Sequence, residues 1–243
     1  MNKGIYIALS GATLKQTQMD IISNNLANAN TAGFKRDKIS FQEHLLSQMN
    51  NRVEYPDGRT LSSIGTVTTD HAPGSVVHTG NDFDIAIDGE GFLTLENGQY
   101  TRRGDLRLDS EGYVVNHRGV KVLGTGGPIQ ITAEGRVSIS NEGEVSVKTA
   151  EAELSVMGTI RVVTFSDTTT LSKSGEDAFT ADSQAPQTVT AAIAQGYLEK
   201  SNVDAVKEMV QMITALREFE AYQKAIQSFD DSIGRVLSDM PRI

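Results

Sequence analysis

Apolar residues recur every three or four positions along the first 30 residues of the chain. Lys15 is the one interruption in the series Ile5, Ala8, Ala12, Met19, Ile22, Leu26 and Ala29. This spacing predicts a helix over residues 1–30 with an apolar seam along one side. A helix of that length extends over about 40 Å. Its end is predicted by residues that favour turns, namely Asn28, Asn30, Thr31 and Gly33.

The last 43 positions carry a second apolar series with the same spacing. Gln223 and Asp230 interrupt the seam, which consists of Met209, Met212, Leu216, Phe219, Ile226, Ile233 and Leu237. Asp204 can accept hydrogen bonds from the first free backbone N–H groups of a helix that begins beside it. No proline occurs before Pro241, so this helix can extend over about 50 Å.

The middle of the chain alternates over short distances, which is typical of strands. Residues 84–88 alternate between polar and apolar positions, and Asn97-Gly98 is a strong hairpin turn. Acidic-Gly pairs precede β-branched runs at three further places, Glu111-Gly112, Glu134-Gly135 and Glu142-Gly143. We interpret them as hairpin corners. Residues 31–80 have no sustained period and contain several Gly and Pro, so they are interpreted as a connector.

These patterns predict an α+β chain. Residues 1–30 and 201–243 form long terminal helices in a coiled-coil-like α domain, 31–80 form the connector, and 81–200 form an inserted antiparallel all-β domain of short strands. A single helical hairpin buries one seam only, so the remaining apolar faces need neighbouring copies of the chain. We expect the contacts between helices and subunits to involve Ile5, Ala12, Met19, Ile22, Asn25, Leu26, Met209, Met212, Leu216, Phe219, Ile226 and Ile233.

Composition excludes several classes of partner. The net charge is −9, from 22 Lys and Arg against 31 Asp and Glu, which argues against binding to nucleic acid or to an anionic membrane. The chain has no cysteine, hence no disulfide or thiolate metal site. We find neither a signal peptide nor an apolar run long enough for a spanning helix. From these features alone we would expect a cytoplasmic protein.

Candidate catalytic and cofactor sites are weak. His44, His71, His78 and His117 lack metal-ligand spacing. The segment that starts at Asp84 has Ala86 and Leu95 where a calcium loop needs oxygen ligands. The glycines at 89 and 91, and at 124, 126 and 127, lack the strand-to-helix context of a nucleotide site. Asp88 and Glu90 lie on one turn, where solvated carboxylates are the simpler interpretation. We therefore expect no catalysis, metal or cofactor.

Two terminal motifs and one internal motif resemble those of the bacterial flagellar rod and hook family. The first is Asn24-Asn25-Leu26-Ala27-Asn28 followed by Thr31-x-Gly33-Phe34-Lys35. The second combines Ser201-Asn202-Val203-Asp204 with Glu208-Met209-Val210-x-Met212-Ile213 and Arg217-x-Phe219-Glu220. Family members often have Tyr in place of Phe219 and Asn in place of Asp204. The body adds Gly80-Asn81-x-x-Asp84-Ile85-Ala86-Ile87-x-Gly89-x-Gly91-Phe92 and Tyr100-Thr101-Arg102-x-Gly104.

The resemblance implies a structural subunit of the flagellar basal-body rod, most like the proximal rod subunit, with the distal subunit as the runner-up. Such a subunit associates through its terminal helices into the helical drive shaft that crosses the periplasm. The implied partners are its own copies, other rod subunits and the flagellar type III export apparatus, which exports the chain without signal cleavage. Phe41 and Leu45 resemble the export element of early substrates, although both could simply pack on a neighbouring element.

A second class of protein remains open at this point. A secreted β-rich carbohydrate-binding or adhesin module would also have a β body without catalytic residues. Such a module needs an exposed aromatic platform. The chain has no Trp, and Tyr100 and Tyr113 are the only tyrosines in the clearly β region before Gly196. Binding of the isolated 81–195 fragment to insoluble peptidoglycan would distinguish the two classes.

Overall fold

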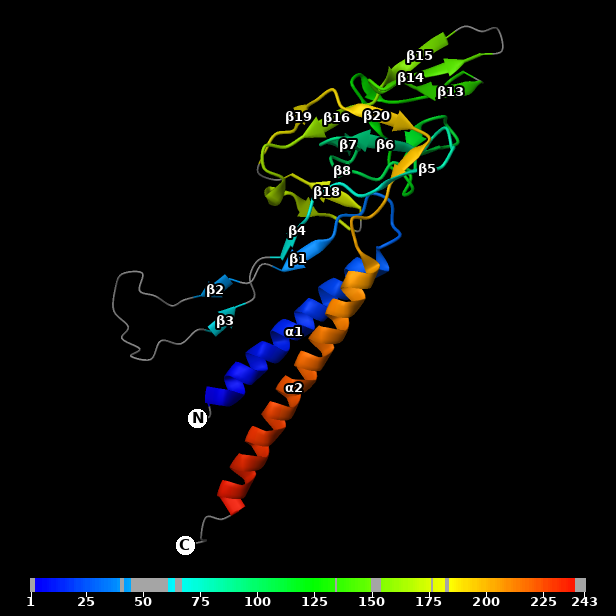
Figure 1. The fold of residues 1–243 in the computed structure, drawn as a ribbon. Helices are drawn as coiled ribbons and strands as arrows, with labels where there is room; N and C mark the ends of the chain where they lie inside the picture. The colour runs from blue at the N-terminus through cyan, green and yellow to red at the C-terminus, as the bar shows by residue number, and fades with distance from the viewer. Residues whose placement is uncertain are drawn as a thin grey trace. The chain divides into compact units, whose positions relative to one another are not determined.

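Two terminal helices and a series of short strands make up the described part of the chain (Figure 1). The computed structural model describes residues 3–39, 42–44, 61–63, 67–133, 135–149, 154–175, 177–181 and 184–238. Contacts between residues divide the chain into two units. The helical unit comprises Met1–Ala27, Asp37–Thr68 and Asp204–Ile243, and the β unit comprises Asn28–Arg36 and Thr69–Val203.

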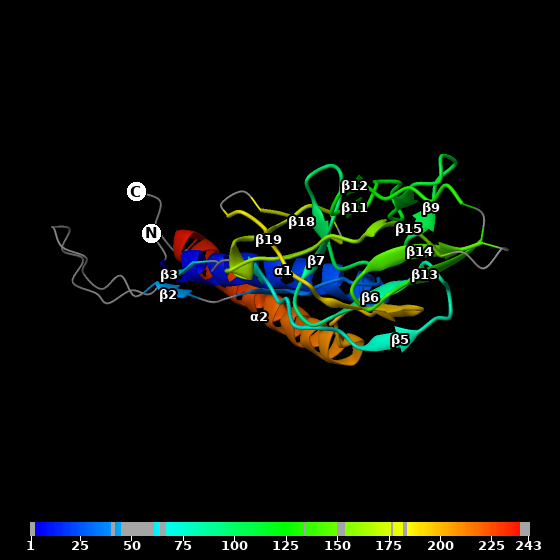
Figure 2. The ribbon, with the colours of Figure 1, turned by 90° about the horizontal axis from the view of Figure 1, so that it is seen from above.

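The helical unit contains both α-helices of the described chain. Helix α1 (Lys3–Ala27) and helix α2 (Ala205–Ser238) lie side by side, as Figures 1 and 2 both show. The side chain of Asp204 begins α2 by accepting hydrogen bonds from the N–H groups of Val206 and Lys207, each 3.1 Å long. Four short strands complete this part of the chain in two pairs, β1 with β4 and β2 with β3: β1 (Asp37–Ile39), β2 (Gln42–His44), β3 (Leu61–Ser63) and β4 (Val67–Thr69).

The largest sheet of the β unit has six strands in the order β17-β18-β8-β7-β16-β19. Asn97-Gly98 turns β7 into β8 as predicted, with Gly98 at a φ of 77°. A 3₁₀ turn at Thr168–Thr170 precedes β17. The six strands are β7 (Phe92–Thr94), β8 (Tyr100–Thr101), β16 (Val162–Thr164), β17 (Ser172–Lys173), β18 (Ala178–Thr180) and β19 (Gln187–Thr188).

The β unit also contains a three-stranded sheet, β13-β14-β15, and four strand pairs. The pairs are β20 with β6, β21 with β5, β10 with β9, and β11 with β12, all antiparallel. Their bounds are β5 (Val76–His78), β6 (Ile85–Asp88), β9 (Arg107–Leu108), β10 (Val114–Val115), β11 (Leu123–Gly124), β12 (Gly127–Pro128), β13 (Arg136–Ile139), β14 (Glu144–Lys148), β15 (Leu154–Thr159), β20 (Ala192–Gln195) and β21 (Tyr197–Glu199).

Two apolar clusters hold the β unit together. The larger one is almost entirely aliphatic and β-branched, and it includes Leu93, Val122, Val147 and Ile193. The smaller one is aromatic and contains Phe92, Phe165 and Phe179. Burying a side chain of this size stabilises the fold by about 1.5–3 kcal/mol. Short strands can therefore form a stable β unit when their apolar residues point into these clusters.

The predicted coiled-coil-like domain is wrong, although the chain is α+β overall. The described residues contain one N-terminal and one C-terminal helix around a β-rich centre. The predicted seam of α2 matches its contact face only in part, because Met209 and Leu216 are 45% and 46% exposed, whereas Met212, Phe219 and Ile226 are half-buried. Ala215, which lies beside that seam, is buried. Large aliphatic side chains dominate the sequence pattern, whereas the actual contact also sets small residues such as Gly11 of α1 against aromatic rings such as that of Tyr222 on α2.

Candidate assembly site

Glycines on α1 face aromatic rings on α2. A Cβ added to Gly11 would lie 2.5 Å from the ring of Tyr222, and one added to Gly4 would lie 2.7 Å from the ring of Phe229. The two glycines are seven positions apart, and the two aromatics are seven positions apart in the opposite direction. The two helices are therefore antiparallel and keep one register between these contacts. The absence of a Cβ at Gly4 and Gly11 lets the rings lie directly on the α1 backbone.

Polar contacts continue the same register. The ammonium group of Lys15 lies 2.5 Å from the carboxylate of Glu218. Towards the C-terminal end of α1, Asn25 Nδ2 lies 3.5 Å from Oε2 of Glu208, and both residues are buried. The Asn25 side chain also donates to the carbonyl oxygen of Asp37 at 2.9 Å and accepts from its N–H at 3.0 Å. Asn25 therefore fixes the start of β1 next to the helix pair, which gives this residue of the first motif a structural role.

An apolar face of α2 points away from this contact. Its residues recur at helical spacing on one side of α2, and all are exposed: Val206, Met209, Val210, Ile213 and Leu216. Helix α1 also has exposed apolar residues near its start, Tyr6, Ile7 and Leu9. A contiguous apolar surface of this kind is typical of an interaction site. We call the five α2 residues the outward α2 face.

Eleven of the twelve predicted interface residues fall into three groups by their exposure. Ala12, Ile22 and Asn25 are buried within the helical unit. Half-buried positions are Ile5, Met19, Leu26, Met212, Phe219 and Ile226. Met209 and Leu216 are exposed and belong to the outward α2 face. Ile233 lies on α2 but its side chain is outside the described part, and Phe41 and Leu45 lie outside the described residues.

A buried charge cluster lies where the chain enters and leaves the β unit. Glu199 is 2% exposed. Its Oε1 accepts a hydrogen bond from Lys35 Nζ at 2.6 Å, and its Oε2 accepts one from Arg102 Nε at 2.9 Å. Oε1 also accepts the N–H of Gly74 at 2.9 Å. Lys35 follows α1 by a few residues, and Glu199 precedes α2 by a few. We call Lys35, Arg102 and Glu199 the Glu199 cluster.

Backbone carbonyls satisfy the remaining donors of this cluster. Lys35 Nζ donates to the carbonyl of Ala72 at 2.8 Å. Arg102 donates from Nη1 to the carbonyls of Gly89 and Gly91, at 2.9 and 2.7 Å. Burial lowers the pKa of the Lys35 ammonium, and the hydrogen bond and charge of Glu199 oppose that shift. The cluster is a connected polar network inside the β unit.

The internal motif and part of the first motif meet at this cluster. Gly33 donates its N–H to the carbonyl of Glu199 at 2.8 Å and has a φ of 66°. A Cβ at Gly33 would lie 2.5 Å from the backbone nitrogen of Arg103. Phe34 is buried, and Lys173 Nζ lies 4.2 Å from the centre of its ring. These contacts explain why Gly33 is followed by an apolar residue and then a lysine.

A half-buried histidine lies beside the cluster. The ring centre of His71 is 5.1 Å from that of Phe179 and 5.7 Å from that of Phe92. Burial, and then the positive charge of Lys35, lower the pKa of His71 from 6.5 to about 4. The imidazole is therefore neutral inside the aromatic cluster at neutral pH.

We expect this histidine to make the β unit sensitive to acid. Because the pKa is lower in the folded chain, the unfolded chain gains a proton first as the pH falls below about 6.5. The free energy of unfolding therefore has its full value above pH 6.5 and declines by about 1–2 kcal/mol as the pH falls to about 4. Urea denaturation at several pH values measures this, and His71→Phe should have a shallower slope. Parallel slopes for variant and wild type would contradict this role.

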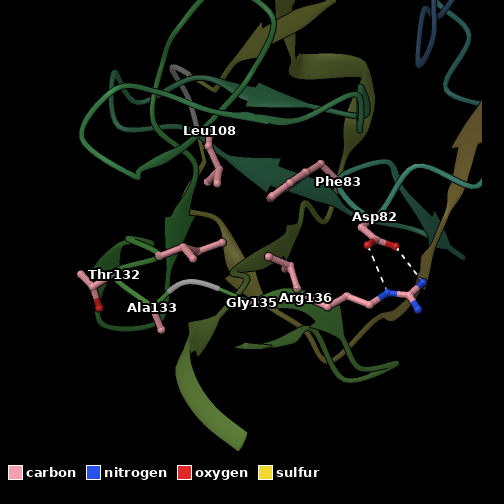
Figure 3. A pocket seen from close by; sticks show the side chains of 9 residues that line it. Asp82, Phe83, Leu108, Thr132, Ala133, Gly135 and Arg136 are labelled. Atoms are coloured by element: carbon pink, nitrogen blue, oxygen red, sulfur yellow. Dashed lines mark hydrogen bonds and ion pairs between the residues drawn. The ribbon is translucent and has the colours of Figure 1, made fainter. Parts of the chain in front are cut away.

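An open pocket of about 450 Å³ lies elsewhere on the β unit (Figure 3). The residues that line it are Asp82, Phe83, Leu108, Ile131, Thr132, Ala133, Gly135, Arg136 and Val137. Arg136 and Asp82 form an ion pair there at 3.3 Å. The charged groups of the pocket thus neutralise each other, and they do not form a catalytic pair.

Two negative findings apply to the described residues alone. Within them, no group of three or more His, Cys, Asp or Glu is placed to hold a metal ion. Neither α1 nor α2, over the part described, is apolar enough along its length to cross a membrane.

Three protein families match separate parts of the chain. The family described as "Flagella basal body rod protein" matches residues 5–35, which include most of α1 and the turn after it. "Flagellar hook protein FlgE/F/G D1 domain" matches residues 86–147 in the β unit. "Flagellar basal body rod FlgEFG protein C-terminal" matches residues 194–239, which include α2. The matched regions thus contain the helix pair as well as Lys35, Arg102 and Glu199.

Full-length relatives match almost the whole chain. The flagellar basal-body rod protein FlgG of Bacillus subtilis is 32% identical in an alignment that covers 98% of this chain and 99% of that protein. FlgG of Borreliella burgdorferi is 33% identical, over 96% of this chain and 97% of the relative. FlgF of Caulobacter vibrioides is also 33% identical, over 94% of each chain.

Proposed function

Because the chain belongs to the family of flagellar basal-body rod proteins, as a structural subunit of the rod, we propose that its terminal segments carry the assembly. In this proposal residues 1–30 and 201–243 join neighbouring subunits, 31–80 connect, and 81–200 form the β-rich part. The outward α2 face is the observation that carries the proposal. In the single chain this face exposes apolar side chains to water, which is unfavourable. Burial against neighbouring subunits removes this unfavourable hydration.

The helix pair serves this role as a preformed element. The glycine–aromatic contacts and the Lys15–Glu218 pair keep α1 and α2 in one register, so the outward α2 face has a defined shape before it meets a partner. A surface of this kind loses less conformational entropy on assembly than a disordered segment. Joining unlike surfaces of successive copies without closure produces a helical assembly.

The β unit does not favour the alternative of a carbohydrate-binding or adhesin module. Tyr100 is half-buried and packs edge-on against Phe165, with ring centres 4.9 Å apart. Lys121 Nζ lies 3.6 Å from the ring centre of Tyr113. Neither tyrosine thus offers a free, flat aromatic surface for a sugar. Our proposal includes no catalytic activity, and the relatives are named as rod proteins.

We extend the proposal to partners and export. The partners are other copies of the chain, other rod subunits and the flagellar type III export apparatus, and the chain reaches the basal body without signal cleavage. Phe41 and Leu45 are the proposed export element. The names FlgG and FlgF occur among relatives of equal identity, so identity alone does not separate a proximal from a distal position along the rod.

Expression in a strain that lacks the chromosomal copy tests location and export together. We expect the full chain to restore motility and to be found in isolated basal bodies. Phe41→Ala should accumulate inside cells and be depleted from basal bodies, because the export element is damaged. Absence of the wild-type chain from basal bodies would contradict the rod assignment. Normal export of the Phe41 variant would contradict the export element alone.

A further inference from the structure

One edge of the three-stranded sheet lacks a partner in the described part of the chain. In the ladder of β13 with β14, Val147 is in a non-hydrogen-bonded pair, so its N–H and C=O groups point towards β15. Ser155 of β15 lies opposite Val147, so the backbone groups of Ser155 point back towards β14. The N–H and C=O groups of Leu154 and Val156 therefore point away from the sheet. Their side chains are 68% and 58% exposed. Both backbone and side chains of these residues are available at this edge.

Other positions along the edges of this sheet are protected by hydrogen bonds. On β13, the amide of Gln195 donates to the carbonyl of Val137 at 3.0 Å and accepts the N–H of Ile139 at 3.0 Å. At the far end of β15, the carbonyl of Thr159 accepts the N–H of Thr125 at 2.9 Å. Folded proteins normally protect edge strands, because an open edge pairs with other chains. Within the described chain, the backbone groups of β15 that can pair with another strand are thus those of two residues, Leu154 and Val156.

A second open edge lies on β5, at the periphery of the β unit in both views (Figures 1 and 2). The N–H of Thr79 donates to the carbonyl of Gly196, and the N–H of Lys200 donates to the carbonyl of Ser75. Because hydrogen-bonded pairs alternate along an antiparallel ladder, the N–H and C=O groups of Val76 and His78 point away from β21. No hydrogen bond of the described chain uses these outward groups. Val76 and His78 are exposed. This edge also offers two ladder residues, two positions apart.

We propose that β5 of one copy pairs with β15 of the next copy, in antiparallel register, with Val76 opposite Val156 and His78 opposite Leu154. The two edges have equal free length, and neither carries Pro, Asp, Glu, Lys or Arg at its free positions. The pairing forms about four backbone hydrogen bonds. Because β5 and β15 are different surfaces, the contact continues from copy to copy. This inference rests on the proposed rod function and specifies one contact between subunits.

Cysteine cross-linking tests the pairing cleanly, because the chain has no cysteine. Val76→Cys and Val156→Cys chains with different tags are expressed together, and isolated basal bodies are mildly oxidised. Opposite residues of such a pair lie roughly 5.5 Å apart between Cα atoms, which suits a disulfide. We expect a cross-link between the two tags, and none when exposed Leu108→Cys replaces Val156→Cys. Cross-linking of Val156→Cys with itself, or none between incorporated variants, would overturn the pairing.

A pair of charged substitutions tests the same pairing of β5 with β15 if the cysteine variants do not assemble. Val156→Lys alone and Val76→Glu alone should each reduce incorporation into basal bodies at least about tenfold, because each leaves a charge against an aliphatic residue. The double variant places Lys opposite Glu in every contact and should restore incorporation. Failure of restoration, or no loss in the single variants, would overturn the pairing. Absence of the wild-type chain from basal bodies would instead overturn the proposed function.

Discussion

Glu199→Gln lowers the free energy of unfolding of the β unit by an expected ~3–5 kcal/mol. The substitution keeps the shape of the side chain but removes the negative charge that Lys35 and Arg102 share. Removal of one member of a buried ion pair leaves the partner charge uncompensated, and this is far more costly than loss of a surface pair. Thermal unfolding followed by circular dichroism should show a melting temperature lower by about 10 °C or more.

Glu90→Gln is the matched control for this variant. Glu90 is an exposed carboxylate in the same unit, and its substitution should leave the melting temperature within about 1–2 °C of wild type. Equal melting temperatures for the Glu199 and Glu90 variants would contradict the structural role of the Glu199 cluster.

Ala215→Asp destabilises the helical unit strongly, whereas Leu216→Asp does not. Ala215 is buried in the unit, so an aspartate there places a carboxylate in a dry contact at a cost of about 2–5 kcal/mol. Leu216 lies beside it on the outward α2 face, where a carboxylate remains hydrated. Loss of helical signal on heating measures the difference. Equal destabilisation by the two substitutions would contradict the observed contact face.

The order of the elements could be predicted from sequence, but the contact face of α2 could be predicted only in part. Its helical spacing and the Asp204 cap predict a helix near residue 205, and Asn97-Gly98 predicts the turn between β7 and β8. Helix α2, however, has apolar residues on more than one side. Periodicity also placed Met209 and Leu216 in the contact, where both are exposed, and did not select Ala215, which is buried. The matched seven-residue spacing of two glycines on α1 and two aromatics on α2 was the available signal.

The Glu199 cluster could not be predicted from spacing, because its members are far apart along the chain. Glu199 lies 164 positions from Lys35 and 97 from Arg102. A single charged residue is usually exposed, and each of these three would be interpreted so on its own. The resemblance identified the motifs that contain Lys35 and Arg102, but not their common partner. The three-dimensional structure is needed to see that the motifs meet.

The amount of the Leu216→Asp variant in isolated basal bodies directly tests the proposal that the outward α2 face joins subunits. The variant is expressed as the only copy, secreted protein is measured in parallel, and exposed Glu220→Gln on the same helix is the control. We predict that the Leu216 variant folds and is exported like wild type, yet falls at least about tenfold in basal bodies and does not support motility. Incorporation at the wild-type level, with normal swimming, would contradict the role of this face in assembly.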